Sequence, residues 1–146
     1  MKVSTRTRYG LRLMVCLAEY YGNGPVLLKD IAKNQDISEK YLSLIVIPLR
    51  AAGLIQSTRG ARGGYTLARK PELITVADIV DVLEGEPCLV DCVKNPAQCP
   101  RVPICPTRDV WSILGEKIRE TLAAISLPSL VAVSLGKGRN TFMENI

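Results

Sequence analysis

The segment covering residues 27–67 constrains the fold more than any other part of this sequence. Apolar residues at helical spacing predict a short helix at residues 27–33. After a polar break, Ser38 is placed to cap a longer helix that extends from residue 39 to about residue 52. Two helices joined by a short turn are typical of a helix-turn-helix, although Pro48 is expected to distort the second helix locally.

The residues that follow the second helix predict a β-hairpin. Residues 54–58 have the composition of a strand and residues 64–67 that of its return, with Arg59, Gly60 and Arg62 between them. A hairpin directly after a helix-turn-helix is a winged helix, and arginines at its tip are attracted by the negative potential of a narrow minor groove. The combination predicts DNA binding, while the alternative is a solvated turn with incidental charge.

The charge is distributed unevenly along the chain. The net charge is +5, but residues 1–70 carry 12 Lys/Arg against 4 Asp/Glu, whereas residues 71–146 carry 7 against 10. A basic first half and a slightly acidic second half favour a polyanion-binding module joined to a part that does not touch the polyanion.

The absence of histidine restricts the chemistry available to the chain. With no histidine, Ser-His-Asp and Cys-His catalysis, His-ligated zinc and Rieske-type clusters are excluded. No glycine-rich phosphate loop of the required spacing is present, so we do not expect an enzyme. The charged start of the chain lacks a signal peptide and the apolar runs are short, which predicts a cytoplasmic protein without a membrane anchor.

Three longer helices are expected outside the motif. Ser4 caps a helix that reaches Tyr21, and Thr75 with Asp78 opens a helix that Gly85 ends. Residues 107 to about 126 form a long amphipathic helix, whose apolar face comprises Val110, Trp111, Leu114, Ile118, Leu122 and Ile125. This helix suits pairing with a second copy, because helix-turn-helix proteins normally bind two half-sites as dimers.

The expected architecture is mainly α with a small β-hairpin wing, that is, a winged helix-turn-helix domain plus a long dimerisation helix. The winged-helix domain and its linking helix take residues 1–84, and a cysteine-rich loop takes residues 85–106. The dimerisation helix and a short last helix take residues 107–135, and residues 136–146 are expected to form a flexible tail.

The exposed start of the second helix of the motif should contact base edges in the major groove. Lys40 is expected to reach guanine, Ser43 either kind of base edge, and Leu44 a thymine methyl group. The full set of residues expected to contact DNA is Tyr9, Ser38, Lys40, Tyr41, Ser43, Leu44, Arg50, Arg59, Gly60 and Arg62. Among these, Arg50 and Tyr9 are assigned to phosphate contacts.

Four of the five cysteines lie between Cys88 and Cys105, in a segment rich in proline. Thiols in a reducing compartment bind metal or perform redox chemistry more often than they form disulfides. The spacing leaves three uses open, which are an iron–sulfur cluster, a thiol redox switch and structural zinc. The fifth thiol, Cys16, lies near an apolar stripe and is expected to be buried and structural.

Several short motifs in order resemble the Rrf2 family of bacterial winged-helix regulators. They are Lys2-Val-Ser-Thr5, Arg8-Tyr9-Gly10-Leu11, Ser38-x-x-Tyr41-Leu42, Leu49-Arg50-x-x-Gly53-Leu54 and Arg59-Gly60-x-x-Gly63-Gly64-Tyr65. The resemblance covers about residues 1–135. It implies a homodimer held by the long helix, with the cluster loop just before that helix, and regulation of iron–sulfur assembly genes.

The resemblance also assigns roles to the cysteines. In the cluster-binding members the last of three cysteines precedes a tryptophan by six residues, as Cys105 precedes Trp111 here. By that register Cys92, Cys99 and Cys105 are the ligands. The fourth ligand stays open, because Cys88 is chemically suited but falls outside the register. The alternatives are a group from the partner chain, a small exogenous molecule, or a carboxylate such as Glu84, Asp91 or Asp109. The resemblance favours a [2Fe–2S] over a [4Fe–4S] cluster. This chain departs from the cluster regulators at Arg108, which stands where they carry a histidine. A guanidinium is a poor ligand because it stays protonated.

Overall fold

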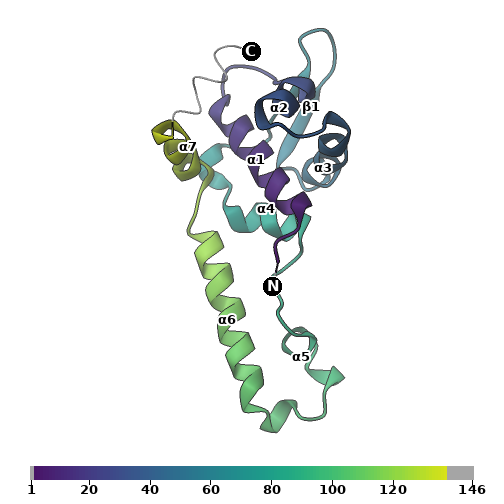
Figure 1. Cartoon of the computed structure of the whole chain (residues 1–146), viewed down its shortest axis with the longest axis vertical. Helices are drawn as coiled ribbons and strands as arrows, with labels where there is room; N and C mark the ends of the chain where they lie inside the picture. Colours follow the sequence, from purple (N-terminus) through teal and green to yellow (C-terminus); the bar gives the residue numbers. More distant parts are fainter. Residues whose placement is uncertain (1, 138–146) are drawn as a thin grey trace.

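The computed structural model describes residues 2–137, which form a helical body and a long arm that leaves it (Figure 1). The helices are α1 (Thr5–Glu19), α2 (Leu28–Gln35), α3 (Glu39–Ala51), α4 (Val76–Leu83), α5 (Asp91–Lys94), α6 (Pro106–Ala123) and α7 (Leu127–Gly136). The strands β1 (Ile55–Thr58) and β2 (Gly64–Leu67) pair as an antiparallel hairpin, and 3-10 turns cover Pro71–Leu73, Pro96–Gln98 and Val102–Ile104. The predicted fold class is confirmed.

Capping side chains set the starts of three helices, as the sequence predicted. The hydroxyls of Ser4 and Ser38 accept hydrogen bonds from backbone N–H groups in the first turns of α1 and α3. Thr75 and Asp78 form a reciprocal capping box at the start of α4. Each such cap contributes about 1 kcal/mol because it satisfies a donor that the helix leaves without a partner.

The end of α2 differs from the prediction. The polar residues Asn34 and Gln35 were expected to break the helix, but they belong to it. The last residue of the helix is Gln35, and Asp36 caps it with a φ of 53°, which lies in the left-handed region. The reversal of the chain therefore occurs after the polar residues rather than at them.

The core of the body lies where α1, α3 and α4 meet. Its largest fully buried side chains are Leu13, Met14, Leu17, Ile31, Leu42, Ile45, Leu49, Leu54, Ile55, Ile74, Ile79 and Leu127. Gly10 permits the close approach of these helices, because a side chain there would collide with Leu83 of α4. Cys16 is also fully buried, as predicted, and burial raises the pKa of its thiol to about 12.

The hairpin is fixed to the body by the segment between α1 and α2. Val26 exchanges two backbone hydrogen bonds with Tyr65 of β2, at 2.9 and 2.8 Å. Gly64 makes this approach possible, since its φ is 140° and a side chain there would collide with the backbone oxygen of Val26. The direction of the wing is therefore set by a contact outside the hairpin.

The arm consists of α6 and the segment that precedes it. At 18 residues α6 is about 27 Å long, and none of its residues is buried by the described part of the chain. It ends at Ala123, earlier than expected, because the chain then pairs back onto the body: Val76 donates to the carbonyl of Ile125, and Leu127 donates to that of Ile74. Among residues 2–137, no helix combines the length and apolar character needed to cross a membrane.

The last described helix, α7, lies beside α1 in the body rather than along the arm (Figure 1). Leu127 is fully buried in the core, and the Ser134 hydroxyl donates to the carboxylate of Glu19. Gly136 was assigned to a flexible tail but is the last residue of α7. Residues 138–146 of that expected tail lie outside the described residues.

Candidate DNA interface and cysteine loop

The helix α3, which carries the predicted recognition residues, lies on the side of the body away from α7 (Figure 1). Ser38, Lys40, Ser43 and Leu44 are exposed, and Tyr41 is half-buried. The Ser43 hydroxyl donates to the Lys40 carbonyl at 2.6 Å. Its proton is therefore engaged within the helix, and its lone pairs remain to accept a hydrogen bond from a base.

An aromatic contact with α1 supports α3, the predicted recognition helix. The rings of Tyr9 on α1 and Tyr41 on α3 meet edge to face, with centroids 5.8 Å apart and an interplanar angle of 89°. The guanidinium groups of Arg8 and Arg12 lie 5.9 and 5.4 Å from the centroid of the Tyr9 ring. The structure thus gives Tyr9 a packing role, and its contact with phosphate stays a prediction.

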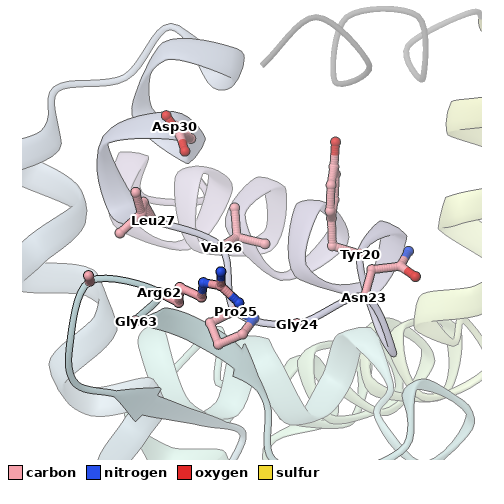
Figure 2. A pocket seen from close by; sticks show the side chains of 10 residues that line it. Tyr20, Asn23, Gly24, Pro25, Val26, Leu27, Asp30, Arg62 and Gly63 are labelled. Carbon is pink, nitrogen blue, oxygen red and sulfur yellow. The ribbon is translucent and has the colours of Figure 1, made fainter.

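The wing presents its arginines around a well-defined turn. Arg59, Gly60 and Arg62 are all exposed. Figure 2 shows Arg62 beside Pro25 and the start of α2, where these residues line a hollow of about 470 Å³. At the base of the wing, Arg50 of α3 donates to the Ser57 hydroxyl of β1 at 3.2 Å. This bond ties the end of the recognition helix to the hairpin.

The structure adds two residues that the sequence did not single out. Ile47 on α3 is 62% exposed, and Arg6 at the start of α1 is exposed beside it. Both line a hollow that includes Tyr41 and Leu44. The sequence did contain a signal for Ile47. It follows Leu44 by three residues, and residues at this spacing share one face of a helix.

In the cysteine loop, Cys105 has the environment of a reactive thiol. It is the N-cap residue of α6, where the helix dipole favours negative charge. The Thr107 hydroxyl lies 3.2 Å from its sulfur, and this contact, followed by the backbone N–H of Arg108, lowers the pKa of the Cys105 thiol. A thiol that ionises readily is suited to binding metal.

The segments that carry Cys92 and Cys88 contact different parts of α6. The Arg108 side chain donates to the Cys92 carbonyl at 3.2 Å, which holds α5 against the start of α6. Pro87, next to Cys88, lies instead beside Gly115, with its oxygen 3.8 Å from where a Cβ would stand. Gly115 follows Cys105 by ten residues, which is roughly 15 Å along the helix. Cys92 is therefore anchored to a residue near the start of α6, whereas Cys88 adjoins a residue that contacts its middle.

The loop fits an iron–sulfur cluster in the chemistry of its donors. Cys92, Cys99 and Cys105 are free and partly exposed, and thiolates are the usual ligands of such clusters. Their side chains are not assembled, since among residues 2–137 no three His, Cys, Asp or Glu side chains form a group that could hold a metal ion. The 3-10 turns that begin near Pro96 and Pro103 shape the loop without gathering its thiols.

Glu84 joins the end of α4 to the start of α1, immediately before the cysteine loop. The Ser4 hydroxyl donates to its carboxylate at 2.6 Å, and the Thr7 hydroxyl donates to the same oxygen. The bonds from Ser4 and Thr7 lower the pKa of the Glu84 carboxyl. Glu84 therefore anchors the start of α1, the helix whose Tyr9 packs against Tyr41 of the recognition helix.

A helix-turn-helix with an arginine-bearing wing, a recognition helix on the surface and a long arm defines a winged-helix DNA-binding protein. The model of the Rrf2 family, described as an iron-dependent transcriptional regulator, matches residues 3–133. The chain belongs to the Rrf2 family of transcription regulators and is a sequence-specific DNA-binding regulator.

The relatives include proteins of more than one kind. CymR of Bacillus subtilis is 40% identical over 139 residues, covering 94% of each chain. The structure of CymR, described as the global cysteine regulator of B. subtilis, superposes with a TM-score of 0.77 over 91% of this chain and 98% of CymR. Protein rrf2 of Nitratidesulfovibrio vulgaris is 42% identical over 131 residues, covering 90% of this chain and 87% of that protein. The structure of T. potens IscR is 40% identical, with a TM-score of 0.76 over 92% of this chain and 88% of IscR. Overall identity therefore does not distinguish an IscR-like from a CymR-like protein.

Proposed function

We propose that this chain is a homodimeric transcription regulator that senses iron–sulfur cluster status through Cys92, Cys99 and Cys105, and that it controls iron–sulfur assembly genes. The observation that carries the proposal is the concentration of four of the five cysteines on one loop that ends at the N-cap of α6. A bound cluster would supply redox and oxygen sensitivity to that loop.

The dimer is supported by the apolar surface of α6. Val110 is 54% exposed, Ile113 58% and Trp111 39%, all on a helix that projects from the body (Figure 1). Three large apolar side chains exposed within four residues favour an interaction surface. A second copy of the same helix is the partner of matching shape, and it would place two recognition helices on two half-sites.

Communication between the loop and the DNA interface is supported by two contacts in series. The loop leaves the body directly after Glu84, which holds Ser4 and Thr7 at the start of α1. From there, Tyr9 of α1 packs against Tyr41 of α3. Ordering of the loop by a cluster would then shift the start of α1, and with it the recognition helix. This mechanism requires that the contacts between the loop and α3 have two arrangements, of which cluster binding favours one.

Purification under anaerobic conditions tests the cluster. The protein should be brown, absorb between about 300 and 600 nm, and contain iron and acid-labile sulfide. A colourless protein without iron under these conditions would reject the cluster. Zinc in stoichiometric amount would instead support a zinc-stabilised interaction module.

Two matched substitutions locate the ligands. Cys105→Ser should abolish the absorbance, because the N-cap thiol is the one favoured to ionise. Cys88→Ser should retain it, because Cys88 adjoins Pro87 at the middle of α6. Loss of iron from the Cys88 variant would make Cys88 the fourth ligand and contradict this assignment.

A cluster-free regulator responding to thiol oxidation or cysteine metabolism is the second candidate. The 40% identity to CymR over 94% of both chains favours it. In that case the colourless protein should still bind DNA, and oxidation of the loop thiols or the supply of cysteine should change its affinity. Equal affinity in both conditions would exclude this candidate.

A further inference from the structure

The middle of the recognition helix is apolar on its exposed side. Leu44 is 59% exposed and Ile47 is 62% exposed, and both line the same hollow, of about 380 Å³. They are three residues apart on α3, hence about 4.5 Å along the helix axis. Bases on one DNA strand are about 3.4 Å apart, so the two side chains are spaced to meet neighbouring base pairs.

Positive charge surrounds this apolar pair. Arg6 lines the same hollow, while Lys40 and Arg50 are exposed towards the two ends of α3. The acidic residues nearby, Asp36 and Glu39, lie at or before the start of the helix, about two turns or more from Ile47. An apolar strip framed by cations matches a major groove, where base edges lie between two rows of phosphates.

Ser43, the residue before Leu44, restricts which bases fit beside this pair. Ser43 donates its proton to the Lys40 carbonyl, so it offers lone pairs outward. Lone pairs accept from the amino groups of adenine or cytosine and do not match the N7 and O6 acceptors of guanine. Neither Leu44 nor Ile47 can donate a hydrogen bond. These three side chains therefore do not favour guanine, and thymine is the base that presents a methyl group in the major groove.

We propose that Leu44 and Ile47 together determine operator specificity by contacting the C5-methyl groups of two thymines in each half-site. The proposal rests on the DNA-binding function and is independent of the cluster. It assigns Ile47, in addition to Leu44, to base recognition.

The test compares thymine with deoxyuridine, which lacks only the methyl group and keeps every hydrogen-bonding position. The full-length protein first selects its site from a random duplex library, and each thymine of the half-site is then replaced in turn. Replacement at two positions should weaken binding roughly fourfold each, the effect of one buried methyl group. Uridine duplexes that bind as tightly as thymine duplexes would overturn the proposal.

Substitutions assign the effect to the two side chains. Leu44→Ala and Ile47→Ala should each weaken binding to the thymine site and remove the uridine penalty at one position. Leu73 is 65% exposed on the 3-10 turn Pro71–Leu73, so Leu73→Ala is a matched control that should preserve both penalties.

The remaining outcomes distinguish this proposal from the function on which it rests. A uridine penalty that persists in both α3 variants would overturn the assignment while leaving DNA binding intact. A Leu44→Ala/Ile47→Ala variant that binds the site normally but changes oligomeric state would show that the apolar pair contacts a second copy. Failure of the protein to select any site would overturn both the DNA-binding function and this proposal.

Discussion

The body and the arm differ in how much of their apolar surface the chain itself covers. In the body, side chains such as Leu13, Leu42 and Leu49 are fully buried where α1, α3 and α4 meet. In the arm, α6 has no buried residue, and Ile113 is 58% exposed. The body is therefore stabilised by contacts within the chain, whereas the arm carries an exposed apolar surface and thiols that are suited to binding other molecules.

The largest expected effect is on the stability of the body. Leu49→Ala removes a fully buried side chain and should lower the free energy of unfolding by about 2–5 kcal/mol, because it leaves a cavity in the core. Urea denaturation monitored by circular dichroism measures the change. The matched variant Ile113→Ala should hardly alter unfolding within one chain and should raise the dissociation constant of the dimer. Equal destabilisation by both variants in a monomeric protein would remove the distinction between body and arm.

The next effect concerns the attachment of the wing. Gly64→Ala should destabilise the body by about 1–3 kcal/mol, because the new side chain would collide with the Val26 backbone at a φ that favours glycine. It should also weaken DNA binding by turning the wing away. Gly22→Ala is the control, since Gly22 has a φ of 89° but nothing lies within 4 Å of its Cβ position. The same loss of DNA affinity in both variants would show that backbone strain alone is responsible.

The wing arginines should affect binding without affecting stability. Replacing both Arg59 and Arg62 by Ala should weaken DNA binding and reduce the slope of log K against log salt by about 2, since two phosphate contacts are lost. Arg119→Ala on the arm is the control and should leave the slope unchanged, because Arg119 pairs with Asp81 at 3.1 Å. An unchanged slope in the double variant would remove the wing from the interface.

The smallest effect is at the boundary between body and arm. Glu84→Gln should lower stability at pH 7 by about 0.3–1 kcal/mol, because it removes a negative charge from the start of α1. The pKa of Glu84 is below its ordinary value in the folded state, so its contribution is complete above the unfolded pKa of about 4.3 and disappears as the pH falls through the folded pKa. Wild type and variant should therefore converge in acid, as urea denaturation at several pH values would show. Glu72→Gln removes the same charge from another exposed site and is the control for the loss of charge alone.

The helix starts and the hairpin could be predicted because their signals are local. Ser4, Ser38 and Thr75 cap the helices that they were expected to cap, and the return strand occupies the expected residues 64–67. Capping and turn formation depend on residues a few positions apart, which a sequence displays directly.

The departures arise where distant segments meet. The long helix stops at Ala123 rather than near Ser126 because Ile125 bonds to Val76 at the start of α4 and Leu127 bonds to Ile74 just before it. Two other departures concern sites. Glu84, considered as a cluster ligand, is engaged by Ser4 and Thr7, and Ile47 joins Leu44 on the recognition face. No local pattern encodes these contacts, since they depend on how helices far apart in sequence approach each other.

By itself the sequence determined the class of the protein. The order of helices, the arginine-rich hairpin and the cysteine-rich loop follow from side-chain periodicity, turn residues and composition. Tertiary structure decided the direction of the wing, through Val26 and Gly64, and the different positions of Cys88 and Cys92 along α6. The physical reason is that these features depend on non-local backbone approaches of a few ångströms, which the packed helices fix and the residue order does not display.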